Sequence, residues 1–487
     1  MITTTQSRVS ISDKKSALGL SKAARPGEAS GEALPKDSVT SAEVTDVAYS
    51  GYLKFKNYHV GITTDDVLKR YNGGFVHGPG HHIGAIAAMV FDEQMNPHAI
   101  LKTGDTRLSR AERQEPYVQD GFIAGRMDKK GSDASKIALS ELAEEVGGEV
   151  VQGTFRPLGS KPNPTMPLES TESDYYYAAA VEIKGNPYGD GGDMELTDLI
   201  GPKFLPADEA LKTIDSGGVS EGSRSRVLYG RGFDSIGYVP QLGAYVKDHP
   251  KLAERFDTLG LGEVQDIRAT VKPSRLPEPR PKADTLEANV NDVVLRKREE
   301  VPFSDESRMI KARTSHAVNN NGTITPLEAE FPNEYLQLDY DRAKVATYYV
   351  DEKLGPMVQM KSQARPALAF APGVENVVRK DVSDIKLSRG QSLEDQLPPG
   401  ARSLGAPTGA SPGQTDLFYH FVSHRVEPPE NPKESGFVSL AEAVKLCRTG
   451  HGDVQTEALC ERLADDLDWI PNLGMTTADA KKLMSQT

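Results

Sequence analysis

The spacing of hydrophobic residues predicts a β-hairpin in the first half of the chain. Residues 84–91 are almost entirely apolar, residues 92–97 form a polar stretch with a proline, and residues 98–102 are again mostly apolar. Two apolar runs joined by a short polar turn are typical of neighbouring buried strands. Residues 175–182, which begin with three tyrosines, predict a further strand of the same sheet.

Two segments show helical spacing instead. In residues 138–148, Leu139, Leu142 and Val146 recur at intervals of three and four, and Gly147 is a typical C-terminal stop. In the segment after Phe204 and Leu205, helical spacing places four apolar residues on one face, namely Ala207, Ala210, Leu211 and Ile214. The order strand, strand, helix, strand, helix predicts an α+β domain.

The first helix also carries three carboxylates, Glu141, Glu144 and Glu145. Spacings of three and four bring them together on one part of the helix surface, where they repel one another. A divalent cation would relieve this repulsion, and oxygen ligands of this kind suit Mg²⁺ or Mn²⁺. The alternative is a solvated acidic face, because such a pattern is also common on surface helices.

This helix resembles the second half of the Nudix box. Residues 141–147 match the pattern E-U-x-E-E-x-G, and Ala124 and Gly125 resemble the residues that open the box. The first half departs from the pattern, because Ser132 stands at the position of an upstream glutamate and Ser140 at that of an arginine. The order of elements over about residues 50–243 is similar to the ADP-ribose pyrophosphatase branch of this family.

The resemblance implies a metal-dependent site and an α/β/α sandwich fold. Glu141, Glu145 and the main-chain carbonyl of Ala124 would hold Mg²⁺ (or Mn²⁺), and Glu144 would take part in catalysis as a further ligand or a support for one. In that branch the base comes from a distant loop, which here holds Glu195, with Asp193 as a reserve candidate. Gly121 departs from the branch, which often has a glutamate there.

An internal repeat is the second informative feature. Four segments in the first half recur in the same order in the second half: 87–97 as 346–356, 158–177 as 404–419, 204–212 as 437–445, and 238–243 as 469–474. Within the second of these, Leu158–Gly159 matches Leu404–Gly405, and Asp174 is aligned with Asp416. Because none of the segments is of low complexity, we interpret the chain as two tandem Nudix-like domains with mixed β-sheets.

The two copies differ at the box. Residues 389–399 of the second copy lack the glutamates and contain two prolines, which would end any helix there. The second copy keeps Gln363 and Arg365, which resemble a Gln-x-Arg of the family branch, and Arg107 holds the similar place in the first copy. The resemblance therefore implies that Arg107 and Arg365 bind substrate and that the two copies pair within one chain. The alternative is that the second copy is a structural remnant.

Composition sets the domain limits and excludes some classes of protein. Residues 1–48 contain no aromatic residue and predict a disordered tail, and prolines in residues 263–290 predict a linker. The two domains are then 49–262 and 291–480. The net charge of −13 argues against a broad nucleic-acid surface. With two cysteines, no signal peptide and no apolar run of 18 residues, we expect a cytoplasmic protein without a membrane partner.

Two functions follow from this pattern. The first is a Nudix-type pyrophosphohydrolase that cleaves a nucleoside diphosphate linked to another moiety, such as ADP-ribose or a related dinucleotide or nucleotide sugar. The second is a catalytically inactive Nudix-like nucleotide-binding or scaffold protein. The glutamates of the box helix favour the first function, and the altered first half of the box favours the second.

Overall fold

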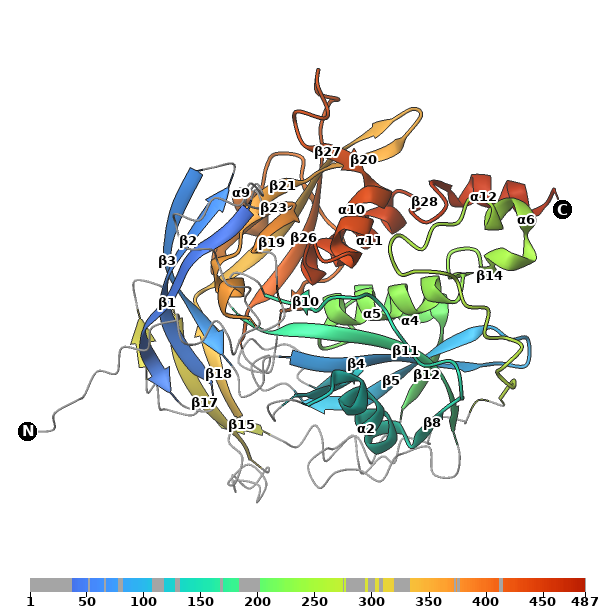
Figure 1. The fold of residues 1–487 in the computed structure, drawn as a ribbon, viewed down its shortest axis with the longest axis horizontal. Helices are drawn as coiled ribbons and strands as arrows, with labels where there is room; N and C mark the ends of the chain where they lie inside the picture. The colour runs from blue at the N-terminus through green and yellow to red at the C-terminus, as the bar shows by residue number, and fades with distance from the viewer. Residues whose placement is uncertain are drawn as a thin grey trace, which may run out of the picture.

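A computed structural model gives the fold of the chain (Figure 1). The structure describes the residues 37–50, 53–64, 67–77, 82–106, 118–127, 132–166, 170–183, 202–274, 276, 294–296, 303–305, 310–318, 333–371, 374, 377–410 and 415–486.

The first sheet is mixed and is built around strand β4 (His82–Phe91). β4 runs parallel to β11 (Ser173–Ile183) and antiparallel to β5 (Pro97–Thr106), and β12 (Lys203–Pro206) follows at the edge beyond β5. The shorter strands of this sheet are β6 (Val118–Gly121), β7 (Ile123–Arg126), β8 (Gly148–Val150), β9 (Arg156–Pro157) and β10 (Asn163–Pro164). The predicted hairpin and the predicted aromatic strand are thus confirmed as β4, β5 and β11.

Helices cover both faces of this sheet, because the side chains of β4 alternate between them. Ile86, Ala88 and Val90 pack against α2 (Ala134–Val146). Ala85, Ala87 and Met89 belong to the core on the other face, which includes α4 (Ala207–Asp215) and α5 (Gly222–Ser235). The prediction for α4 is confirmed, since all four of its expected apolar residues are buried. We call residues 82–274 the first unit.

The second unit, residues 333–486, has a sheet of the same order. Its central strand β19 (Tyr340–Asp351) runs parallel to β26 (Phe418–Arg425) and antiparallel to β20 (Gly355–Gln359), with β27 (Phe437–Ser439) beyond β20. The remaining elements of this unit are β21 (Lys361–Ala364), η3 (Pro366–Phe370), β22 (Val378–Asp381), β23 (Ser383–Ser388), α9 (Leu393–Gln396), β24 (Arg402–Ser403), β25 (Thr408–Gly409), α10 (Leu440–Arg448), α11 (Val454–Asp466), β28 (Trp469–Ile470), β29 (Met475–Thr476) and α12 (Thr477–Met484).

Strand registers match between the units at the positions that the sequence repeat aligns. Phe91 pairs with Pro97 in the first hairpin, as Val350 pairs with Pro356 in the second. After α5 the first unit continues into β13 (Tyr238–Val239) and β14 (Ala244–Tyr245), where Tyr238 pairs with Tyr245 as Trp469 pairs with Thr476. Helices α4 and α10 both have nine residues. These matches define equivalent positions in the two units.

One part of the sequence alignment is wrong by three residues. The backbone N–H of Leu158 donates to the carbonyl of Tyr176, and that of Leu404 donates to the carbonyl of Phe421. Tyr176 is therefore equivalent to Phe421, and Asp174 is equivalent to Tyr419 rather than to Asp416. The shared aspartate and aromatic letters misled the alignment, whereas hydrogen bonding between strands fixes the register.

A separate three-stranded antiparallel sheet precedes the first unit, formed by β1 (Asp37–Ser50), β2 (Lys54–Thr64) and β3 (Val67–His77). The predicted disordered tail is wrong for residues 37–48, which lie in β1; residues 1–36 lie outside the described part of the chain. Val39, Ala42 and Val44 of β1 pack on an apolar cluster, which explains their order despite a polar composition. That cluster lies against the second unit, where Phe370 stacks on Phe75 at 5.0 Å between ring centroids.

A four-stranded sheet leads into the second unit and includes its first strand, β18 (Asn333–Leu338). The other three strands of this sheet are β15 (Val294–Arg296), β16 (Phe303–Asp305) and β17 (Ile310–Val318). The predicted linker 263–290 is wrong at its start, because residues 263–274 pack on the first unit. Ile267 and Val271 are buried, and the N–H of Ser274 donates to the carbonyl of Phe91. The first unit also contains η2 (Val246–Asp248) and α6 (Pro250–Ala253).

The two units meet along helices α5 and α11, and residues of both units belong to one hydrophobic core (Figure 1). α10 and α11 lie above α4 and α5 in this view, and α6 lies beside α12. None of the helices in the described ranges is long and apolar enough to cross a membrane.

Candidate functional site

Helix α2, the box-like helix, starts four residues earlier than its apolar spacing predicts. Asp133 caps its N-terminus by accepting a hydrogen bond from the N–H of Ser135 at 2.9 Å. Gly147 ends it in the left-handed conformation at φ 60°, as the sequence predicts. Its buried face comprises Ala134, Ala138, Leu142, Val146 and, unexpectedly, Glu145.

Glu145 forms a buried ion pair with a lysine of the sheet. The Nζ of Lys102 lies 2.5 Å from Oε1 of Glu145, and the two side chains are 7% and 5% exposed. Lys102 lies on β5, which pairs with β4 beneath the helix. The sequence analysis missed this partner, although a lysine at the end of an apolar strand is a signal that could have indicated it.

The other two glutamates of α2 point elsewhere. Glu144 is exposed and accepts a hydrogen bond from the hydroxyl of Ser140 at 2.7 Å, one turn earlier. Glu141 lies against β7, so close that a Cβ on Gly125 would be 2.0 Å from its Oε1. Gly125 follows Ala124, the other predicted ligand position, so Glu141 and Ala124 are neighbours in the fold. The three carboxylates thus have different surroundings, because Glu145 is buried, Glu144 is exposed and Glu141 lies half-buried against β7.

This arrangement does not fit the predicted metal site. Among the residues that the structure describes, no group of three or more His, Cys, Asp or Glu side chains is placed to hold a metal ion. The ammonium of Lys102 already neutralises Glu145, and it would repel a divalent cation beside that carboxylate. Ser140 stands at the position where the resembled family has an arginine, and its hydroxyl donates a hydrogen bond to Glu144.

Two predicted site residues of the first unit cannot be placed. Arg107 lies in residues 107–117 and Glu195 in residues 184–201, both outside the described part of the chain, as is Asp193. Their roles stay predictions. Asp120 and Gly121, at the end of β6, are buried, and the Nζ of Lys203 contacts Asp120 Oδ2 at 2.6 Å. Burial raises the pKa of Asp120, and the bond to Lys203 opposes this rise.

Arg365 of the second unit lies in a buried cluster of charges rather than on an open surface. Its guanidinium, 2% exposed, forms an ion pair with Asp381, and it lies 3.8 Å from Asp384. Lys344 Nζ contacts Asp381 at 2.7 Å and Asp453 at 3.0 Å. We call these five residues the second-unit cluster; Arg342 joins it through Asp384 at 2.9 Å. Three cations thus balance three carboxylates.

The second-unit cluster occupies positions that hold small residues in the first unit. Strand register makes Lys344 equivalent to Ala85 and Asp384 equivalent to Ala124. As predicted from the prolines, the box helix is missing here, and only the four-residue α9 (Leu393–Gln396) remains. The place that corresponds to the predicted metal site is therefore filled by a charge network of the chain itself.

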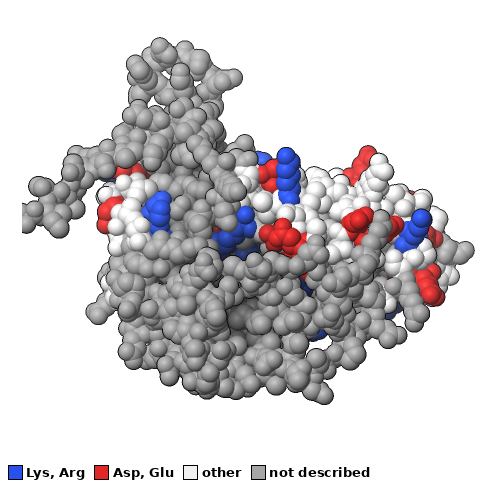
Figure 2. All heavy atoms as spheres, turned by 90° about the horizontal axis from the view of Figure 1, so that it is seen from below, with Lys and Arg blue, Asp and Glu red and all other residues white. Residues whose placement is uncertain are grey.

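On the face seen in Figure 2, the Lys and Arg side chains of the described residues lie among Asp and Glu side chains rather than in a separate patch. Comparisons with protein-family models and with curated proteins found no match for this chain.

Proposed function

We propose that this chain is a Nudix-like protein that binds a nucleoside diphosphate linked to another moiety, without cleaving it by metal-dependent chemistry. The observation that carries the proposal is the buried Lys102–Glu145 pair, which places a cation of the protein beside a carboxylate that the resemblance expects to hold the metal ion. Glu144, turned to solvent with Ser140, supports it. The matching order of strands in the two units supports the interpretation as two Nudix-like domains.

A metal-dependent pyrophosphohydrolase is the second candidate, and one observation favours it. Glu141 lies on the backbone of Gly125 beside Ala124, so two of the predicted ligand positions are adjacent. In that case Glu145 would have to exchange Lys102 for the metal. Breaking a buried ion pair leaves an uncompensated charge and costs roughly 3–5 kcal/mol, which the metal would have to supply.

Manganese binding and turnover separate the two candidates. We expect that thermal unfolding of the wild-type protein does not shift with Mn²⁺, and that no phosphomonoester is released from ADP-ribose or nucleotide sugars. Lys102→Met keeps the bulk of the side chain but removes its charge, so the variant should gain a saturable stabilisation by Mn²⁺. Lys203→Met is the matched control, because it removes a lysine–carboxylate pair of the same sheet away from α2.

Binding must be measured as well. ADP-ribose should stabilise the wild-type protein or give heat on titration in the absence of divalent cations. Cleavage of ADP-ribose by the wild-type protein that is abolished in Glu145→Gln would establish the hydrolase instead. Neither binding nor cleavage across a panel of nucleoside diphosphate compounds would reject both candidates.

A further inference from the structure

The contact between the two units is unusually rich in charge. Among the described residues, five arginine–carboxylate ion pairs cross it, namely Arg226–Glu461 at 3.2 Å, Arg226–Asp465 at 2.5 Å, Arg231–Glu457 at 2.5 Å, Arg448–Asp234 at 2.7 Å and Arg462–Asp215 at 2.9 Å. The arginine side chains are 1–4% exposed and those of Glu457 and Glu461 0–8%, whereas the side chains of the three aspartates are 15–33% exposed. Buried pairs contribute little net stability but penalise a wrong partner strongly.

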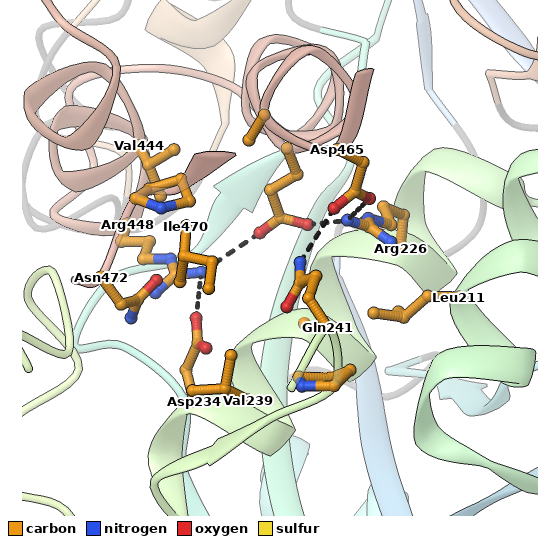
Figure 3. Close-up of a pocket in the computed structure, with 15 residues that line it drawn as sticks. Leu211, Arg226, Asp234, Val239, Gln241, Val444, Arg448, Asp465, Ile470 and Asn472 are labelled. Atoms are coloured by element: carbon orange, nitrogen blue, oxygen red, sulfur yellow. Dashed lines mark hydrogen bonds and ion pairs between the residues drawn. The ribbon is translucent and has the colours of Figure 1, made fainter. Parts of the chain in front are cut away.

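Equivalent residues of the two units face each other across this contact (Figure 3). A cavity of about 40 Å³ lies between α5 and α11, and its walls include Val239 and Ile470, which are equivalent, as well as Gln241 and Asn472. Leu211 and Val444 form a third such pair. The units are therefore related by an approximate two-fold axis that passes near the cavity, as expected for paired copies of one domain.

The charges break this symmetry. Arg226 of α5 is equivalent to Glu457 of α11, because both helices continue in the same register into β13 and β28. If two copies of the first unit were paired in this way, the Arg231–Glu457 contact would become a contact between Arg231 and Arg226. If two copies of the second unit were paired, the contact between Arg226 and Glu461 would become a contact between Glu457 and Glu461.

The most central pair is also asymmetric in size. Gly230 and Glu461 hold equivalent positions, and a Cβ on Gly230 would lie 2.9 Å from Oε2 of Glu461. Glu461 is held between Arg226, whose Nε lies 3.2 Å away, and Arg448, whose Nη2 lies 3.1 Å away. Only a glycine opposite leaves room for this glutamate. Two glutamates at these positions would meet near the axis.

We propose that the α4–α5 face of the first unit is a recognition surface that accepts the second unit and rejects another copy of itself. The partner it selects presents an acidic helix face in α11 and the arginine Arg448 at the end of α10. The chain thus contains two paired units, and neither unit can be replaced by a copy of the other. This holds whether or not the protein binds a nucleotide.

A double-mutant cycle in the full-length protein tests the recognition surface. Gly230→Glu places a second carboxylate against Glu461 and should lower the unfolding midpoint by roughly 5 °C or more. Adding Glu461→Gly removes the opposing carboxylate, so that the two positions again hold one glutamate and one glycine. The new glutamate at residue 230 lies one helical turn from Arg226 on α5. The double variant should therefore be more stable than Gly230→Glu alone.

A second double variant separates charge from space. Gly230→Glu with Glu461→Gln removes the repulsion but not the crowding, so it should recover only part of the loss. A Gly230→Glu protein as stable as the wild type would overturn the proposal. So would strictly additive effects of Gly230→Glu and Glu461→Gly, because the loss would then come from α5 itself rather than from its partner.

Discussion

Replacing Arg365 by methionine should destabilise the protein rather than specifically weaken ligand binding. The guanidinium is 2% exposed and forms an ion pair with Asp381, whose side chain is fully buried. Removing one partner of a buried pair typically costs 3–5 kcal/mol. Lys344 Nζ remains 2.7 Å from Asp381, and methionine keeps much of the volume, so we expect the lower end, about 3 kcal/mol.

Urea unfolding followed by tryptophan fluorescence and circular dichroism measures this change. The slope exceeds about 3 kcal/mol per molar urea for a chain longer than a small domain, so a loss of about 3 kcal/mol lowers the midpoint by up to roughly 1 M. Arg402→Met is the matched control. Arg402 also forms an ion pair, with Asp466, but its side chain is 55% exposed, and such pairs contribute about 0–1 kcal/mol.

The result that would refute this reasoning is a variant with an unchanged urea midpoint and weakened binding of a nucleoside diphosphate. That outcome would restore the substrate-binding role that the sequence resemblance implies for Arg365. A midpoint shift equal to that of Arg402→Met would equally contradict a structural role, because it would mean that burial adds nothing to the pair.

Three further predictions follow. Burial raises the pKa of Glu461 from an ordinary 4.5 to about 8, against the opposing effect of Arg226 and Arg448, and burial also raises the pKa of Asp234. The stability that these groups contribute should therefore fall as the pH rises from about 5 to 8, and the loss caused by Gly230→Glu should grow over the same range as Glu461 ionises. Glu461→Gln should flatten this pH dependence in thermal unfolding scans. Gly84→Ala should lower the unfolding midpoint more than Gly125→Ala. The new Cβ at residue 84 would lie 2.2 Å from the backbone carbonyl oxygen of Ala134, whereas the new Cβ at residue 125 would lie 2.0 Å from the side-chain end of Glu141, which can move. Equal midpoints for the two variants would contradict this reasoning. Glu144→Gln should change neither stability nor ligand binding measurably, since Glu144 is exposed and accepts a hydrogen bond from Ser140 of the same helix. A loss of binding would reinstate Glu144 as a site residue.

Local pattern was sufficient to predict β4, β5, β11, α2 and α4 of the first unit, but α5 was not predicted. Apolar runs gave β4, β5 and β11, and helical spacing gave α4 with all four of its buried residues. The order of β1 was not predictable in this way, because its few apolar residues are buried by η3, a segment about 320 residues later in the chain. Pattern within a segment contains no information about so distant a partner.

The candidate site shows the same limit more sharply. Spacing of three and four correctly placed Glu141, Glu144 and Glu145 within one turn of a helix, but not which of them faces the sheet. Glu145 is buried because Lys102 lies beneath it, and that pairing depends on the position of β5 across the sheet from α2. A group of carboxylates in a sequence predicts a metal ion only if no basic side chain of the protein lies beside them in the fold.

In both units, basic residues of the chain itself form ion pairs with buried carboxylates. In the first unit, Lys102 neutralises the box glutamate Glu145; in the second, Lys344 and Arg365 neutralise Asp381. Each internal cation removes the electrostatic reason for an external one. If this is correct, divalent cations should stabilise only variants that lack these basic residues, and a wild-type protein stabilised by Mn²⁺ through Glu145 would show that the ammonium yields its place to the metal.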